Sequence, residues 1–389
     1  MKQVYLDYSA TTPVRKEVVD EMIPFFSEHF GNPSSAYEQG YKTRRAIDVA
    51  RNRLASLIGA NDKEIFFTSS GTEANNWALS GVCETLKGKG NHIITSRIEH
   101  PAILKQCEFL ERQGYKITYL DVRDDGIVDP KALEAAITNN TILISIMFIN
   151  NEIGTIQPIK ELCKIARKHK ILFHTDAVQA LGSTPIDIKE LDVDMMSMSA
   201  HKIYGPKGVG ALYIKQGVRV ANFMHGGAQE NRKRPGTENL TGIVGFGKAA
   251  EMAKDNLIEQ ITRITELREY FVDKVTSEID EVYLNGNRQL RHPGNANLRF
   301  DYIEGEAILV LLDMKGVSVS TGSACASGEL APSHVLSALN LPLEQIHSSL
   351  RFTIGAFTTK EDLDYVISEL KIIVEKLRSI SPLSAKKGW

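Results

Sequence analysis

The chain has 389 residues, of which 42% are hydrophobic and 24% are charged, and its formal net charge at pH 7 is -2. This composition is typical of a globular protein, and a charge so close to zero excludes a general attraction to nucleic acid or to an anionic membrane. The length predicts two domains, or one large domain with a smaller lobe.

Helical and strand periodicities alternate from about residue 42 to residue 215, which predicts a mainly parallel sheet covered by helices. The expected strands are 64–68, 92–95, 116–120, 141–148, 171–175 and 193–198. The expected helices are one that ends before Gly59, followed by 72–86, 102–113, 130–137 and 159–168. Asp129 and Pro130 form a helix start, with an acceptor at the N-cap and proline in the first turn. Sheets of this kind bind ligands beyond the carboxyl ends of their strands.

A long helical pattern from about 243 to 279 leads to a second region in which strands and helices again alternate. The expected strands there are 296–300, 316–320 and 350–354, and the expected helices are 304–314, 332–339 and 360–377. This pattern predicts a smaller α/β lobe after the main sheet. The sequence shows no internal repeat and no low-complexity linker.

Targeting and cysteine signals are weak throughout the chain. No apolar run reaches the roughly 18 residues of a transmembrane helix, and the first residues lack the features of a secretory signal. The four cysteines are scattered and form neither a metal-spaced pair nor a disulfide framework: Cys83, Cys107, Cys163 and Cys325. We therefore expect a cytoplasmic protein that uses no metal, no nucleic acid and no membrane.

Lys202 lies in a glycine- and proline-containing segment directly after the expected strand 193–198, and Asp176 closes the expected strand 171–175. An amine and a carboxylate at neighbouring strand ends are what a pyridoxal phosphate enzyme requires. The amine bonds to the aldehyde of the cofactor, and the acid keeps the pyridine nitrogen protonated. Gln179 could donate to the ring oxygen, and Ser199 and His201 could complete a phosphate site. A lone lysine in a loop is more often solvated, and Asp176 alone could be a helix cap.

Three further segments have both a functional and a plain structural interpretation. Gly71 and Thr72 stand at a strand-to-helix turn, where backbone N–H groups and the helix dipole attract a phosphate, although an ordinary helix cap has the same pattern. His100 could stack on the cofactor ring and move protons near neutral pH, or it could cap the next helix. Asn151 follows the expected strand 141–148 and would place an amide near the cofactor edge, or simply form a turn.

Cys325 lies in the segment 320–329, which is rich in serine, glycine and alanine and contains no large apolar side chain. A buried structural cysteine normally has such neighbours, so we interpret Cys325 as a thiol on a mobile loop that collects an atom at the cofactor. The other three cysteines lie in helical patterns and are interpreted as structural. Arg351, on the expected strand 350–354, could bind a substrate carboxylate through its two-pronged guanidinium, or form a surface salt bridge.

These motifs, together with YLDYSATT at 5–12 and GNPSS at 31–35, resemble the cysteine desulfurases that serve nitrogen fixation and iron–sulfur cluster assembly. The resemblance covers nearly the whole chain. It implies that Lys202 is the Schiff-base lysine, that Asp176 contacts the pyridine nitrogen, and that Cys325 takes the sulfur as a persulfide. It implies the following further contacts: His100 on the ring, Gln179 on the ring oxygen, Thr72, Ser199, His201 and the partner subunit's Thr237 on the phosphate, and Asn151 and Arg351 on the substrate carboxylate.

The same resemblance implies an α/β fold of the pyridoxal phosphate-dependent transferase fold type I. A large domain (14–254) would hold a mainly parallel seven-stranded sheet, and a small α/β domain (1–13 and 255–389) would carry the cysteine loop at about 320–332. Members of the family are homodimers that convert L-cysteine to L-alanine. The sulfur acceptor would be an iron–sulfur scaffold, on which Cys325 could co-ligate a nascent cluster, or a tRNA-thiolating enzyme. The tail 384–389 does not resemble the extension that docks a scaffold in some members, so the acceptor stays open.

Two alternatives remain from the residues alone. An aminotransferase, or another α,β-lyase such as a selenocysteine lyase, would also need Lys202 and Asp176 but would not need Cys325 on a loop. A catalytically silent sulfur carrier or assembly scaffold would be colourless, and the intact lysine–aspartate pair argues against it.

Overall fold

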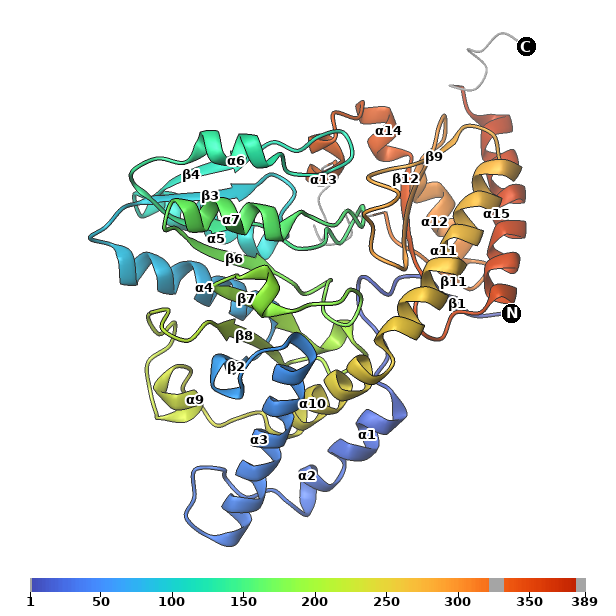
Figure 1. Ribbon diagram of the computed structural model, residues 1–389. Coiled ribbons are helices and arrows are strands. Elements are labelled where there is room, and N and C mark those ends of the chain that lie inside the picture. Colours follow the sequence, from blue (N-terminus) through green and yellow to red (C-terminus); the bar gives the residue numbers. More distant parts are fainter. Residues whose placement is uncertain (1, 322–331, 383–389) are drawn as a thin grey trace.

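The structure is a computed structural model that describes residues 2–321 and 332–382. Its centre is a seven-stranded sheet in which only β8 runs against its neighbours (Figure 1). In sheet order the strands are β2 (Ile65–Thr68), β8 (Gly210–Ile214), β7 (Met195–Ser199), β6 (Leu172–Asp176), β5 (Thr141–Ser145), β3 (His92–Ser96) and β4 (Lys116–Leu120). The predicted mainly parallel seven-stranded sheet is confirmed. β8, which the sequence reading did not separate out, is the reversed strand.

Helices cover both faces of this sheet because its strands are apolar on both sides. Within each of β2 and β3, successive side chains pack in different hydrophobic cores. Phe66 of β2 and Ile93 of β3 pack in one core, and the next residues, Phe67 and Ile94, pack in the other. Since successive strand side chains point to opposite faces, the two cores lie on opposite sides. One core contains residues of α4 (Gly71–Leu86) and α5 (Pro101–Arg112). The other contains residues of α1 (Lys16–Met22), α3 (Glu38–Ile58), α6 (Pro130–Ala136), α7 (Ile159–Lys168), α8 (Ile188–Leu191) and α10 (Leu240–Asp255).

Local sequence signals set several of these helix ends as predicted. Gly59 ends α3 in the left-handed conformation with φ 72°. The Asp129 side chain accepts a hydrogen bond from the backbone N–H of Lys131, and Pro130 opens α6. The long helical pattern predicted over about 243–279 is confirmed except for one break, which divides it into two helices. The first helix ends at Asn256 (φ -111°, ψ 10°), whose amide donates to the carbonyl of Met252 at 2.9 Å, so the side chain competes with the helical backbone.

The chain after Asn256 forms what we call the C-terminal lobe. Its three-stranded antiparallel sheet has the order β12-β10-β9, and α11, α12 and α15 pack around it. The elements are α11 (Leu257–Glu278), β9 (Val282–Leu284), β10 (Asn295–Phe300), α12 (Gly305–Asp313), β11 (Val317–Ser318), α13 (His334–Ala338), α14 (Leu343–His347), β12 (Ser349–Thr353) and α15 (Lys360–Ile380). In the part of the chain that the structure describes, no helix is long and apolar enough to cross a lipid bilayer.

The first residues of the chain belong to the core of this lobe. Strand β1 (Val4–Tyr5) pairs in parallel with β11, and Figure 1 shows the two strands beside α15. Val4 and Leu6 are buried in the same core as β10 and β12. The chain then leaves the lobe and runs to the central sheet, which it reaches at Thr12, where Thr12 N donates to the carbonyl of His201 at 3.1 Å. The exact domain limits given above stay a prediction.

Candidate active site

A cavity of about 260 Å³ lies beyond the carboxyl ends of β3, β5, β6 and β7. Among the described residues, it gathers every site residue predicted from the sequence except Thr237. They are Gly71, Thr72, His100, Asn151, Asp176, Gln179, Ser199, His201, Lys202 and Arg351. Seven other residues line it, and three of these contact the predicted site residues although sequence reasoning gave them no role: Ser9, Ala10 and Asn75. Parallel strands place their carboxyl ends at one edge, which explains how residues so far apart in sequence meet.

One end of the cavity is the N-terminus of α4. The Ser70 side chain accepts a hydrogen bond from the Glu73 N–H at 3.1 Å, so the helix begins at Gly71 with its first amides toward the cavity wall. A Cβ on Gly71 would lie 2.6 Å from the Cγ2 of Val178, which only a glycine avoids. The cap and the phosphate interpretations are therefore both compatible with this turn. Free helical N–H groups and the dipole favour an anion here.

His201 and Ser199 line the same cavity from the end of β7. Burial lowers the pKa of His201 to about 4, with the charges of Lys202 and Lys207 acting in the same direction. Its imidazole is therefore neutral at pH 7 and offers one N–H donor rather than a second positive charge.

Asp176 forms the base of the cavity at the end of β6 and is 6% exposed. One carboxylate oxygen accepts a hydrogen bond from the Val178 N–H at 2.9 Å, and the other accepts one from the Asn75 Nδ2 at 2.6 Å. The sequence also allowed Asp176 to be the N-cap of a helix. Its hydrogen bond with the Val178 N–H has the form of such a cap, but no helix follows. Asn75 lies inside α4 and carries no motif of its own, so only its place one helical turn after Gly71 could have suggested this role.

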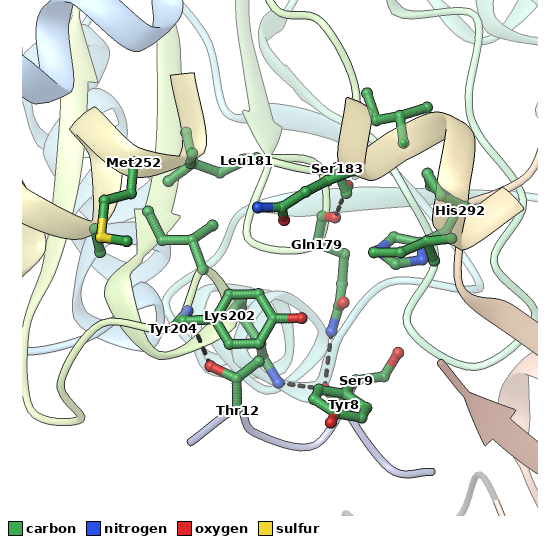
Figure 2. Close-up of a pocket in the computed structure, with 18 of the residues that line it drawn as sticks. Tyr8, Ser9, Thr12, Gln179, Leu181, Ser183, Lys202, Tyr204, Met252 and His292 are labelled. Atoms are coloured by element: carbon green, nitrogen blue, oxygen red, sulfur yellow. Dashed lines mark hydrogen bonds between the residues drawn. The ribbon is translucent and has the colours of Figure 1, made fainter. Parts of the chain in front are cut away.

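Lys202 ends a single 3-10 turn, Ala200–Lys202, directly after β7. Its Nζ donates to the carbonyl of Ser9, and to that of Ala10 at 2.7 Å. Gln179 Nε2 donates to the same Ser9 carbonyl at 3.1 Å. Figure 2 shows Lys202 and Gln179 converging on Ser9 from the sheet. The N-terminal segment is therefore a wall of the site, which composition and periodicity could not reveal because its contacts use backbone carbonyls.

His100 is the N-cap of α5, and its Nδ1 accepts a hydrogen bond from the Ala102 N–H at 3.1 Å. The cap interpretation is thus correct, and the same residue also lines the cavity. Burial lowers the pKa of His100, opposed by the charge of Asp176 and reinforced by that of Lys202. The imidazole is therefore neutral at pH 7, and because Nδ1 accepts this hydrogen bond, the ring proton lies on Nε2.

Glu99, next to His100, is fully buried and bridges two strand ends. Its carboxyl accepts hydrogen bonds from Ser96 Oγ at 2.6 Å and from the Met147 N–H at 2.9 Å. Burial raises the pKa of Glu99 to about 8. His334 Nε2 donates to the Glu99 carbonyl at 2.9 Å, which fastens the start of α13 to the turn that carries His100.

Arg351 reaches the cavity from β12 of the C-terminal lobe, and its side chain is only 2% exposed. One terminal nitrogen donates to the Asn151 carbonyl at 3.0 Å, and the other donates to Asp7 Oδ1 at 2.8 Å. The alternative of a surface salt bridge is therefore wrong, because the guanidinium is buried, while the Asp7 side chain is 18% exposed. Asn151 and Arg351, which were proposed as a pair, lie in contact.

One predicted residue of the described chain is not in this cavity. Thr237 lines a separate hollow with Glu230 and Arg234. Cys325 lies outside the described residues. Before that gap, Ser320 and Arg351 exchange two backbone hydrogen bonds of 3.2 and 2.7 Å, and after it His334 contacts the Glu99 carbonyl.

The remaining three cysteines are buried inside helices. Burial raises the pKa of the Cys83 and Cys163 thiols to about 12, and it also raises that of Cys107. Thiols of this kind stay protonated at pH 7 and are poor nucleophiles. Across residues 2–321 and 332–382, no cluster of three or more potential ligands is placed to hold a metal ion.

Comparison with known proteins gives consistent matches over the full chain. The family model described as "Aminotransferase class-V" matches residues 4–366. "Cysteine desulfurase IscS" of Dictyoglomus turgidum is 57% identical over 388 residues, which are 100% of this chain and 98% of that protein. The protein of the same name from Clostridium botulinum is 53% identical over 98% of this chain and 97% of its own length.

A solved structure described as "NIFS-LIKE PROTEIN" superposes with a TM-score of 0.90 at 36% identity, covering 97% of this chain and 100% of that one. The fold, the strand-end cavity and the full-length identity agree. The chain belongs to the class-V aminotransferase family and, within it, to the cysteine desulfurases.

Proposed function

We propose that this enzyme removes the sulfur of L-cysteine, releases L-alanine and carries the sulfur as a persulfide on Cys325. The observation that supports this most directly is the convergence of Lys202, Asp176, His100 and Arg351 on one cavity. An amine, a carboxylate, a neutral imidazole and a guanidinium are the groups needed to hold a cofactor aldehyde, its ring nitrogen, a mobile proton and a substrate carboxylate.

Pyridoxal phosphate is the cofactor that fits these residues. Asp176 is a buried carboxylate with no ion-pair partner among the described residues, and such a group favours a cationic N–H beside it. The helix start at Gly71 and Thr72 suits the phosphate, with Ser199 and His201 as further donors. Gln179 would contact the ring oxygen. When bound, the cofactor supplies an electron sink that stabilises negative charge at the substrate α-carbon.

The residues of the chain divide the remaining tasks. Lys202 holds the aldehyde, and its Nζ moves the proton at the substrate α-carbon. Arg351 and Asn151 hold the substrate carboxylate, which fixes which bond of the substrate is cleaved. His100 is assigned the removal of the proton of the substrate thiol or of Cys325, and burial keeps its imidazole neutral at pH 7.

The last step transfers the substrate sulfur to Cys325. The thiolate of Cys325 attacks the substrate sulfur, and an S–S bond forms as the C–S bond breaks. The electron pair of the C–S bond stays on the substrate carbon, which takes up a proton and leaves as part of L-alanine.

The decisive experiment is incubation of the purified yellow protein with L-cysteine, followed by mass spectrometry of its peptides. One additional sulfur on the peptide containing Cys325, with alanine in solution, is the expected result. Cys325→Ser should lose the sulfur adduct, whereas the matched variant Cys83→Ala should keep it, because the Cys83 thiol is buried and protonated. A 2-oxo acid with an aminated cofactor would instead support transamination.

The position of the cofactor has a separate test. Borohydride reduction should attach the cofactor to Lys202, and Lys202→Ala should prevent both this adduct and alanine release. Attachment to another lysine would contradict the assignment of the site.

A homodimer with shared active sites completes the proposal. Thr237 lies outside the Lys202 cavity of its own chain, on a loop whose hollow is separate, which suits a contact from the partner subunit's Thr237 to the phosphate. Large apolar side chains are exposed around α2 (Pro24–Ser27), on the loop after it and at the start of α3, at Ile23, Phe26, Phe30, Tyr37 and Tyr41. Sedimentation of the purified protein at twice the monomer mass would support this, and a monomer that binds cofactor with full affinity would oppose it.

The sulfur acceptor is also a proposal: a protein of the iron–sulfur scaffold or tRNA-thiolating kind, in the cytoplasm. Incubating the persulfide form with each candidate acceptor and following the labelled sulfur would identify it.

A further inference from the structure

Asp7 lies beside the guanidinium of Arg351, although nothing in the motifs of the chain assigns it a role. Its segment runs alongside β12: Asp7 forms a parallel bridge with Thr353, and Thr353 N donates to the Leu6 carbonyl at 2.7 Å. Ser9 N also donates to Thr353 Oγ1 at 2.9 Å. The backbone on both sides of Asp7 is therefore fixed to the strand that carries Arg351.

The guanidinium of Arg351 is held in place by very few hydrogen bonds. Its Nε is buried and has no hydrogen-bond partner among the described residues. Only the two terminal nitrogens are held, one by the Asn151 carbonyl and one by the carboxylate of Asp7. Each terminal nitrogen carries two N–H groups, so each keeps one for a ligand, and two N–H groups are what a carboxylate accepts from arginine.

The Asp7 carboxylate is the only charged group in direct contact with Arg351 in the described part of the chain. A second carboxyl is nearby. Glu152 is buried next to Asn151, where burial raises its pKa and the charge of Arg351 opposes that rise. Without Asp7, Glu152 would be the remaining buried partner toward which the guanidinium is drawn, away from its position at the cavity.

We propose that Asp7 is a positioning residue for substrate recognition: it holds the guanidinium of Arg351 so that the remaining terminal N–H groups receive the carboxylate of the amino acid substrate. This inference rests on the proposed function. It predicts that Asp7 matters only for ligands that carry a carboxylate.

The test compares L-cysteine with cysteamine, which has the same amine and thiol but no carboxylate. Binding of each to the pyridoxal phosphate-loaded protein is measured from the change in visible absorbance, and KM and kcat are measured for L-cysteine. For Asp7→Ala we expect binding of L-cysteine to weaken by about 10-fold to 100-fold, the size of one hydrogen bond to a charged group. Cysteamine binding should change by less than about twofold, and the loss should fall on KM rather than on kcat.

Two further variants separate orientation from charge and from folding. Asp7→Asn keeps the acceptor oxygen and should retain most of the affinity for L-cysteine. Asp7→Glu keeps the charge but displaces the guanidinium by one methylene, and should weaken L-cysteine alone; this variant carries the test if Asp7→Ala does not fold. Asp364→Ala, which removes an exposed ion pair with Lys360 in the same lobe, should leave both ligands unchanged.

Each outcome decides the matter. Equal weakening of both ligands in Asp7→Ala would make Asp7 merely structural and overturn the inference, as would unchanged binding of L-cysteine. If the unmodified enzyme binds L-cysteine no better than cysteamine, the carboxylate site at Arg351 itself fails, and the proposed function with it. Discrimination by the unmodified enzyme that survives in Asp7→Ala and Asp7→Glu would refute only the role of Asp7.

Discussion

Replacing Glu230 by alanine should destabilise the fold by about 3 to 5 kcal/mol, the cost of leaving one partner of a buried ion pair behind. The Glu230 side chain is 3% exposed, and its two oxygens accept hydrogen bonds from both terminal nitrogens of Arg51 at 2.7 and 2.8 Å. The Phe67 N–H donates to the same carboxylate at 2.8 Å. In the variant, the Phe67 N–H would lose this acceptor, and the largely buried guanidinium would lose its carboxylate and keep the Ile65 carbonyl at 2.8 Å.

These contacts also hold a strained piece of backbone. Glu230, Asn231 and Arg232 have φ values of 46°, 54° and 65°, so three consecutive residues other than glycine are left-handed. Each costs roughly 1 to 2 kcal/mol, although asparagine tolerates the conformation better. Loss of the Glu230 anchor should therefore release the loop that leads to Thr237. We expect cofactor affinity to fall together with stability.

Urea unfolding of the cofactor-free protein, followed by fluorescence and circular dichroism, measures the first effect. Asp20→Ala is the matched control, because its ion pair with Lys16 is exposed and should contribute less than about 1 kcal/mol. In the double variant with Arg51→Met, part of the loss should be recovered, since no buried charge is then left alone. A loss below about 1 kcal/mol in Glu230→Ala, or strict additivity in the double variant, would refute this reasoning.

Three predictions concern the cavity itself. His100→Gln should lower kcat/KM by about 100-fold to 10,000-fold. In the unmodified enzyme the rate should fall only below about pH 6.5, because the lowered pKa of His100 keeps it neutral above that pH; a limb above pH 7 that vanishes in His100→Gln would contradict this. Gly71→Ala should weaken cofactor binding, measured by absorbance titration, because its Cβ would lie 2.6 Å from Val178; unchanged affinity would show that the helix start can shift freely. Asn75→Leu should weaken cofactor binding and alter the visible spectrum of the bound cofactor, because Asp176 loses its 2.6 Å donor; an unchanged spectrum would count against that contact.

The sequence could predict the elements whose signals are local. Strand 116–120 and helix 159–168 agree with the structure residue for residue, because both are bounded by clear changes in periodicity. The break at Asn256 was missed, since the apolar period continues through it and only the side-chain contact to Met252 ends the helix. Strand β8 was missed because its antiparallel pairing with β2 and β7 is a property of the sheet and not of its own residues.

In the candidate site, too, some residues could be predicted from the sequence and others could not. Residues at strand ends, such as Asp176 and Lys202, could be placed in one site because the carboxyl ends of parallel strands lie at the same edge of the sheet. The contacts of Ser9 and Ala10 could not be predicted, because they are backbone carbonyls on a segment far away in sequence. The ion pair of Asp7 with Arg351 spans 344 positions and depends on the crossing of the N-terminal segment from the lobe to the sheet. The roles of Thr237 and Cys325 stay predictions.

That crossing has a consequence for how the enzyme is made. Residues near the start of the chain contact β11 and β12. During translation, the N-terminal segment therefore cannot make these contacts until the C-terminal lobe has been synthesised. At a synthesis rate of about 5 to 20 residues per second, the 344 positions between Asp7 and Arg351 correspond to roughly 20 to 70 s. The ribosome thus holds a nascent chain whose main sheet is complete while its catalytic pocket still lacks a wall.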